Sequence, residues 1–112
     1  MKYHEIFPMG RPELEVLLES GNESAIIEAL LSAAYYDPDW RWVQGVCLRF
    51  LDHAEVAVRS NAATCLGHIA RIHKTLDLEL VLTRLLPLKR DAAIGPWVED
   101  ALEDIRFFLR VQ

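Results

Sequence analysis

The feature that most constrains the fold is an internal repeat with a period of 36 residues. A shift by 36 positions brings four rows of apolar or small residues into register: Ile26, Ala62 and Val98; Ala29, Cys65 and Ala101; Leu30, Leu66 and Leu102; Ala33, Ile69 and Ile105. The intervening segments register more loosely, through Leu14, Phe50 and Leu86. Within each repeat the positions are three or one apart, which predicts an amphipathic helix. Because one helical hairpin cannot bury both of its faces, such repeats indicate stacked hairpins with a shared core.

Proline, glycine and capping residues divide the chain into six predicted helices. They cover residues 12–21, 22–36, 38–51, 54–73, 78–86 and, beginning at Ala92 or Pro96, the stretch that ends at Leu109. Gly21 suits a left-handed helix end, and Asn22, Asp37 and Asp77 are expected N-caps. Residues 87–91 are expected to form a turn. The sequence therefore predicts an all-α fold: an α-solenoid of three stacked antiparallel hairpins, in one domain over residues 1–112.

Composition narrows the classes of function. The chain has 12 Lys and Arg against 17 Asp and Glu, a net charge of −5, which disfavours nucleic-acid binding and favours a basic partner. Cys47 and Cys65 fall at apolar helix positions and are expected to be buried free thiols. Two such cysteines and the absence of a long apolar run indicate a cytoplasmic protein that neither spans nor binds a membrane.

No pattern in the sequence favours catalysis or a cofactor. The histidines His53, His68 and His73 lack the i, i+4 pairing that places two imidazoles on one helix face, so no metal site is expected. Cys65 and His68 are three residues apart, but Cys65 lies in the core register, where its thiol would be inert. Acidic neighbours such as Glu99 and Asp100 are typical of a solvated face. We therefore expect a binding protein rather than an enzyme.

Residues 52–70 resemble a HEAT repeat, with an acidic turn, the pair Val58-Arg59 opening the second helix, and then Ala, Leu and Gly in register. Only the middle repeat shows this signature well, and 36 residues is shorter than the HEAT period of about 40–47. The resemblance implies a HEAT-like stack in which Arg59 braces the turn between repeats against an acidic residue, for which Asp52 is the candidate.

A second resemblance runs from residues 40–44 to residues 71–73. This stretch is similar to small helical immunity proteins of bacterial contact-dependent inhibition (CDI) and other polymorphic-toxin systems. That resemblance implies a protein that binds and neutralises a cognate toxin.

Candidate partner-binding residues are those that depart from the core pattern. On the fourth helix, a polar stripe that includes Ser60 is expected to face a groove, and acidic residues gather at residues 37–39 and on the last helix. Trp42 lies off the buried stripe of its helix and would suit an interface anchor. The predicted binding residues are Tyr36, Asp37, Asp39, Trp42, Thr64, His68, Arg71, Glu99, Asp100 and Glu103.

Plainer interpretations remain open at this point. Trp42 could pack against the first hairpin, the carboxylates could serve solubility alone, and Trp97 could either pack or bind. The preferred function is an immunity protein that blocks a basic toxin, a nuclease by preference, in a 1:1 complex through an acidic face. The alternative is a HEAT-type adaptor or scaffold subunit of a larger intracellular complex, which should expose an apolar helix face.

Overall fold

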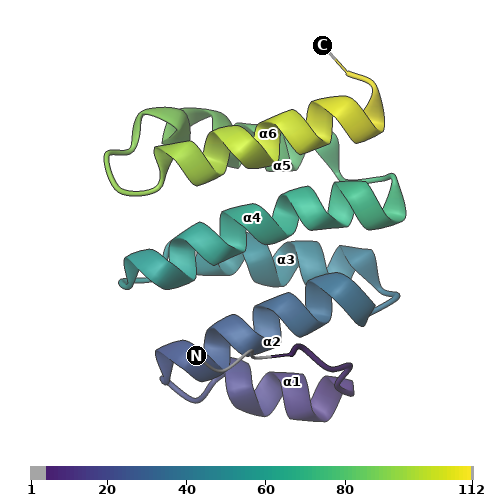
Figure 1. Cartoon of the computed structure of the whole chain (residues 1–112), viewed down its shortest axis with the longest axis vertical. Coiled ribbons are helices and arrows are strands. Elements are labelled where there is room, and N and C mark those ends of the chain that lie inside the picture. Colours follow the sequence, from purple (N-terminus) through teal and green to yellow (C-terminus); the bar gives the residue numbers. More distant parts are fainter. Residues whose placement is uncertain (1–4, 112) are drawn as a thin grey trace.

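The computed structural model describes residues 5–111 and consists of three antiparallel helical hairpins stacked along the long axis of the molecule (Figure 1). Its elements are α1 (Arg11–Leu18), α2 (Glu23–Tyr36), α3 (Trp40–Phe50), α4 (Val56–His73), α5 (Leu78–Leu85), the short 3-10 helix η1 (Leu86–Arg90) and α6 (Gly95–Leu109). Residues 5–111 contain no strand. The all-α fold of stacked hairpins is thus confirmed.

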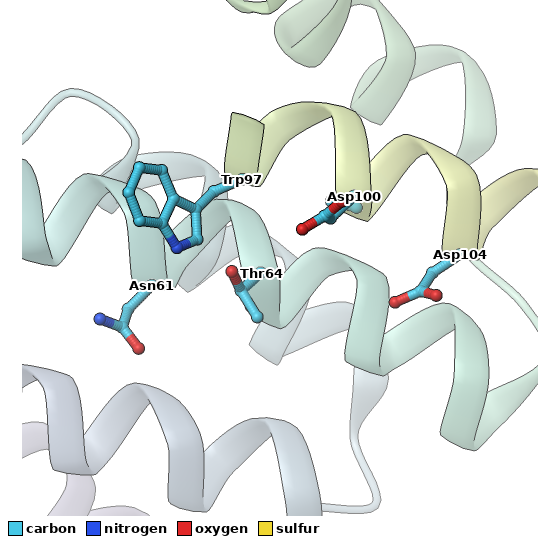
Figure 2. A pocket seen from close by; sticks show the side chains of 6 residues that line it. Asn61, Thr64, Trp97, Asp100 and Asp104 are labelled. Carbon is cyan, nitrogen blue, oxygen red and sulfur yellow. The ribbon is translucent and has the colours of Figure 1, made fainter. Parts of the chain in front are cut away.

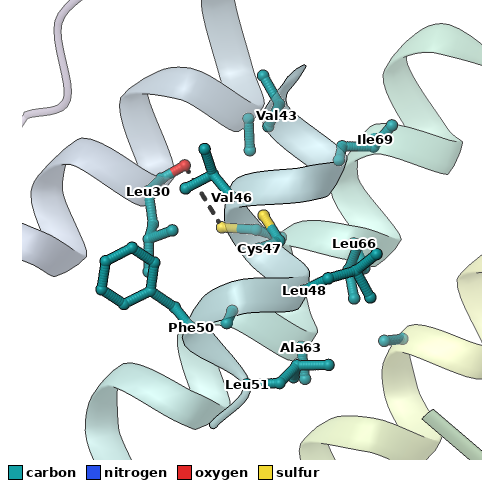
Figure 3. Close-up of a cluster of buried hydrophobic side chains, with 14 of the residues drawn as sticks. Leu30, Val43, Val46, Cys47, Leu48, Phe50, Leu51, Ala63, Leu66 and Ile69 are labelled. Carbon is teal, nitrogen blue, oxygen red and sulfur yellow. Dashed lines mark hydrogen bonds between the residues drawn. The ribbon is translucent and has the colours of Figure 1, made fainter. Parts of the chain in front are cut away.

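The four apolar rows predicted from the repeat form the core. All twelve of their members are at most 3% exposed, and Figure 3 shows how Leu30, Leu66 and Ile69 interdigitate with side chains of α3. The looser row fails at its third member, because Leu86 begins η1 and is 47% exposed. The repeat therefore holds for the second helix of each hairpin and weakens in the first.

Small residues let the second helices approach one another closely. The tightest packing between hairpins is between α4 and α6 and between α2 and α4, whereas α3 and α5 make almost no contact. At the α4–α6 crossing, a β-carbon on Gly67 would lie 3.2 Å from Ala101 Cα and 3.1 Å from Asp104 Oδ2. Gly67 therefore sets the spacing of these two helices, and α2, α4 and α6 share one face of the stack.

The start of α3 differs from the sequence prediction by two residues. Asp39, not Asp37, is the N-cap: its Oδ1 accepts a hydrogen bond from the Trp42 backbone N–H at 3.2 Å. Asp37 instead accepts from the Asp39 N–H at 2.8 Å, which closes a small turn around Pro38. The chain forms this turn before the helix begins, which leaves Asp39 as the side chain that caps the first turn of α3.

The other helix ends agree in part with those predicted from the sequence. Asn22 caps α2 as expected, accepting from the Ala25 N–H at 2.9 Å, and Gly21 has the predicted positive φ of 72°, although α1 ends earlier, at Leu18. Asp77 makes no side-chain cap. Its own N–H donates to the buried Gln44 side chain at 2.7 Å, which ties this loop to α3.

The turn expected at residues 87–91 is largely helical, since η1 covers residues 86–90. Gly95 begins α6, and Pro96 falls in its first turn, where proline costs no hydrogen bond. A β-carbon on Gly95 would come within 2.7 Å of the Lys89 carbonyl oxygen. The glycine therefore allows α6 to start directly against η1.

Two ion pairs connect the second hairpin to the third, but not as the HEAT resemblance implied. Arg59 pairs with Asp91 at 3.5 Å, and Asp52 pairs with Arg84, whose Nη2 lies 3.0 Å from both carboxylate oxygens. Asp91 also accepts the N–H groups of Ala93 and Ile94, and these bonds lower the pKa of its carboxyl, with a smaller contribution from Arg59. Arg59 thus braces the following turn rather than its own, and the expected Arg59–Asp52 contact is wrong.

Both cysteines are free and buried, as predicted. The Cys65 thiol donates to the Leu30 carbonyl oxygen at 3.6 Å, across the α2–α4 interface (Figure 3). The neighbouring Cys65 side chain, together with burial, raises the pKa of the Cys47 thiol. Both therefore act as small core residues, and the Cys47 thiol stays protonated at neutral pH.

Candidate partner-binding surface

The exposed side of α4 presents a polar stripe along the middle of the stack. Its members are Asn61, Thr64, His68 and Arg71, three to four residues apart and all partly or fully exposed. Ser60, which the sequence placed in this stripe, is 7% exposed, and its hydroxyl donates to the Ala57 carbonyl oxygen at 3.1 Å. Asn61 therefore takes the place of Ser60 in the stripe, and Thr64, His68 and Arg71 remain members of it.

A hollow of about 390 Å³ lies between this stripe and α6. Asn61 and Thr64 line it from α4, and Trp97, Asp100, Ala101 and Asp104 line it from α6. Figure 2 shows the Trp97 ring at the start of α6 above Asn61, with Thr64 between the ring and the two aspartates. We call this hollow the α4–α6 groove.

The groove is acidic and has an aromatic rim. Asp100 and Asp104 are one helical turn apart, and no Lys or Arg within residues 5–111 forms an ion pair with either carboxylate. Trp97 is 46% exposed, an unusual degree for so large an apolar side chain. Two unpaired carboxylates beside an exposed indole form a surface suited to a cation.

His68 lies beside the groove and is held as a neutral imidazole. Its ring packs against Tyr35, with centroids 5.1 Å apart, and its Nδ1 lies 3.2 Å from Arg71 Nη2. Because Arg is always a donor, Nδ1 accepts this hydrogen bond. Burial and the Arg71 charge lower the pKa of His68, while Asp104 opposes them. The structure thus brings together two predicted binding residues, His68 and Arg71.

The predicted acidic residues do not share one surface. Glu99 and Glu103 lie on the other side of α6 from the groove, where they line a second hollow with Lys89, Leu102 and Arg106. Asp100 alone of the three predicted α6 carboxylates faces α4. The helical repeat explains the division, since residues 99 and 103 form one stripe and residues 97, 100 and 104 another.

A third acidic group, at the start of α3, is occupied by the chain itself. The Arg11 guanidinium lies 3.8 Å from the centre of the Trp42 ring and forms ion pairs with Asp39 at 3.4 Å and Asp37 at 3.9 Å. Trp42 is only partly exposed and packs against the core. The structure therefore shows the packing against the first hairpin that the sequence left open, and a role of Trp42 in partner binding stays a prediction.

Tyr36 is half-exposed, but its hydroxyl is engaged. It donates to the Ile6 carbonyl oxygen at 3.2 Å, and Ser32 donates to the Phe7 carbonyl oxygen at 2.7 Å. Ile6 and Phe7, before α1, thus lie across the end of α2 (Figure 1). Tyr36 fastens this segment and presents only part of its ring to solvent.

The groove contains three residues that the sequence prediction left out: Asn61, Trp97 and Asp104. A signal for them exists in the repeat. A shift by 36 carries Asn61 to Trp97, Thr64 to Asp100 and His68 to Asp104, so the polar stripe of α4 has a register-matched counterpart on α6. Applying the repeat to the exposed positions, and not only to the core, would have found both sides of the groove.

Metal-ligand groups and membrane-spanning helices are two further features that bear on the kind of site. Among residues 5–111, no group of three or more His, Cys, Asp or Glu side chains is arranged to hold a metal ion. Within the same residues, no helix combines the length and apolar character that a bilayer span requires.

The fold and the open groove define the class of the protein as an all-α stack of helical hairpins. Over 96% of its length, the chain matches 97% of a chain in the crystal structure of a CDI complex from Cupriavidus taiwanensis LMG 19424, with a TM-score of 0.86 and 38% sequence identity. The protein therefore belongs to the same family as that chain of the CDI complex. No model of a protein family matches it, and no curated protein does.

Proposed function

We propose that the protein is the immunity partner of a CDI toxin, which it binds and neutralises. The observation that carries the proposal is the full-length match, at 38% identity, to a chain crystallised in a CDI complex. At that identity and TM-score, the helical stack is shared with a chain that was crystallised as part of a complex.

The immunity role, rather than that of the toxin, is supported by charge and shape. The chain carries a net charge of −5, and the α4–α6 groove is an open hollow that two aspartates line. An inhibitor needs an accessible face complementary to its target, and an acidic face steers a basic target to rapid association. On this proposal the protein catalyses no reaction and acts by covering the toxin's substrate cleft.

We further propose that the binding face is the side formed by α2, α4 and α6. Of the predicted residues, Thr64, His68, Arg71 and Asp100 lie there, joined by Asn61, Trp97 and Asp104. Glu99 and Glu103 lie outside this face, on the far side of α6, and contribute less to the proposed interface. Tyr36, Asp37, Asp39 and Trp42 contribute less, because each already makes a contact within the chain.

The finer features of the proposal follow from this charge. The toxin is basic, because it must complement an acidic face. Its activity is that of a nuclease, because an enzyme that binds a phosphate backbone needs clustered Lys and Arg. The complex is 1:1 and forms in the bacterial cytoplasm. Coupling energies for close charge pairs at such interfaces reach about 1.5–7 kcal/mol, enough for tight inhibition.

The adaptor alternative has less support. Among residues 5–111, the large exposed apolar side chains are distributed over many elements, and no helix carries more than two of them. An adaptor that docks through one apolar helix face would need them on a single element.

The test is co-expression with the C-terminal domain encoded by the gene directly upstream. We expect the domain alone to stop bacterial growth, this chain to restore it, and the pair to elute as a 1:1 complex whose affinity falls with salt. A toxin domain from an unrelated system is the control and should remain toxic. Growth arrest that this chain does not relieve, with no complex on the column, would rule out the immunity role.

A further inference from the structure

We propose that the α4–α6 groove is a receptor for one arginine side chain of the toxin, in which Trp97 stacks on the guanidinium, Asp100 pairs with it and Asp104 adds negative charge one turn further along α6. This inference rests on the proposed function, because the arginine belongs to the toxin. It assigns the binding of a toxin side chain to one place on the face formed by α2, α4 and α6.

The protein itself contains a filled site of the same composition. Arg11 is held by one tryptophan and two aspartates: its guanidinium lies over Trp42 at 3.8 Å and pairs with Asp39 at 3.4 Å and Asp37 at 3.9 Å. A guanidinium is planar and weakly hydrated, so it can stack on an indole while its edge N–H groups reach carboxylates. The Arg11 site shows this arrangement at the surface of the same fold.

The groove repeats that composition without a paired cation from residues 5–111. Trp97, Asp100 and Asp104 line one hollow, and no Lys or Arg of residues 5–111 pairs with the two carboxylates. Arg71, a cation of the neighbouring α4 stripe, donates to His68 instead. The negative charge of the groove is therefore available to a partner.

The shape of the groove favours arginine over lysine. The hollow of about 390 Å³ is open on one side and has the indole at one end and carboxylates along α6 (Figure 2). Asn61 and Thr64 form the opposite wall and add neutral oxygens that accept hydrogen bonds. A planar group with five donors can use acceptors on two walls at once, whereas an ammonium is a compact point charge.

The experiment measures toxin binding by titration calorimetry with two matched double variants. Asp100→Asn with Asp104→Asn removes the groove charges; Glu99→Gln with Glu103→Gln removes two charges from the other side of the same helix. Each changes the net charge from −5 to −3. We expect the groove variant to bind at least about tenfold more weakly, which corresponds to about 1.4 kcal/mol, and the control to stay within about threefold.

A cycle with toxin variants then identifies the arginine. One toxin Arg→Gln variant should weaken binding to the wild-type chain and have little further effect on the groove variant, and Arg→Lys at that position should restore only part of the affinity. Trp97→Ala should weaken binding more than Trp97→Phe. Thermal unfolding of each free variant checks that the fold is retained.

The outcomes separate the two proposals. If the wild-type chain does not bind the toxin, the proposed function falls and this inference falls with it. If the wild-type chain binds, but the groove and control variants lose equal affinity, or no toxin arginine couples to Asp100 and Asp104, the immunity role stands and the arginine receptor is overturned.

Discussion

The start of α3 and the start of α6 carry the same kinds of side chain and use them differently. At the first, Trp42, Asp37 and Asp39 enclose Arg11 of the neighbouring hairpin. At the second, Trp97, Asp100 and Asp104 line an open groove, and no cation of residues 5–111 pairs with the carboxylates. The difference shows that composition alone does not mark a binding site; what matters is whether the chain supplies the counter-ion.

The location of each site in the stack explains the difference. Trp42 is on α3, where α1 of the previous hairpin begins beside it and brings Arg11 over the ring. Trp97 is on α6, and its neighbour α4 presents the neutral Asn61 and Thr64. The first site therefore joins two hairpins, and the second is left for a partner.

The largest expected effect on stability comes from adding a side chain at Gly67, where α4 and α6 cross. In Gly67→Ala the added β-carbon would meet Ala101 Cα at 3.2 Å and Asp104 Oδ2 at 3.1 Å, so α6 must move away from α4. We expect a loss of about 1–3 kcal/mol in the free energy of unfolding, as for other overpacked interiors, measured by urea denaturation.

Gly45→Ala is the matched control for this variant. Gly45 lies within α3, is exposed, and has no atom within 4 Å of the position that a β-carbon would take. Because glycine costs a helix interior about 0.5–1 kcal/mol relative to alanine, this variant should be more stable than the wild type. Equal effects at the two glycines would show that helix propensity, and not the α4–α6 contact, governs both.

The filled site should contribute stability but little to binding. Arg11→Met keeps the apolar stem and removes two weak ion pairs and a cation–π contact, so we expect a loss of about 1 kcal/mol in stability. The loss should shrink in 1 M salt, where charges are screened within about 3 Å. Arg41→Met is the control, since Arg41 lies over Trp40 at 4.7 Å and forms no ion pair with a residue in the range 5–111, and it should cost less. Toxin affinity that dropped tenfold in Arg11→Met would contradict the structural role.

The sequence predicts the stack well because its core is repeated. Each apolar row has one member in each of the three repeats, so one irregular position cannot hide the period. That period alone predicts the twelve buried residues. Helix ends were less secure, because neighbouring residues compete for the same cap, as Asp37 and Asp39 do. The finer HEAT assignment stays a prediction.

The candidate site was harder to predict because surface positions depend on contacts between distant segments. Nothing near Trp42 in the sequence reveals that Arg11 will cover its ring. The division of the α6 acids, by contrast, follows from helical geometry: Asp100 and Asp104 fall in one stripe with Trp97, and Glu99 and Glu103 in another. That part was available from the sequence.

A smaller effect should appear in the pH dependence of stability. Burial and Arg71 lower the pKa of His68 in the folded protein, so the unfolded chain takes up a proton first as the pH falls. Stability is complete above the ordinary histidine pKa of about 6.5 and declines below it, until the lowered pKa is passed. His68→Gln should remove this part of the decline between pH 7.5 and 5.5, measured by urea denaturation.

Asp104 sharpens this test, because its charge raises the pKa of His68 and so opposes the decline. Asp104→Asn should therefore steepen the loss of stability below pH 6.5, whereas Asp100→Asn should change it less. A pH profile that is the same in the wild type and in His68→Gln would show that His68 is not held as a neutral imidazole.

The smallest expected effect is a change in stability that has opposite signs at the two tryptophan sites. Asp100 and Asp104 are like charges at i, i+4 with no ion-pair partner within residues 5–111, a pairing that costs a helix about 0.2–0.5 kcal/mol. The free protein with both changed to Asn should be more stable by that amount. Asp37→Asn with Asp39→Asn has the same change in charge and keeps a capping side chain at residue 39, but it should be less stable, since both carboxylates pair with Arg11. Thermal unfolding of the two variants side by side measures the difference. If both shift the same way, net charge alone explains them, and the contrast between a filled and an open site does not hold.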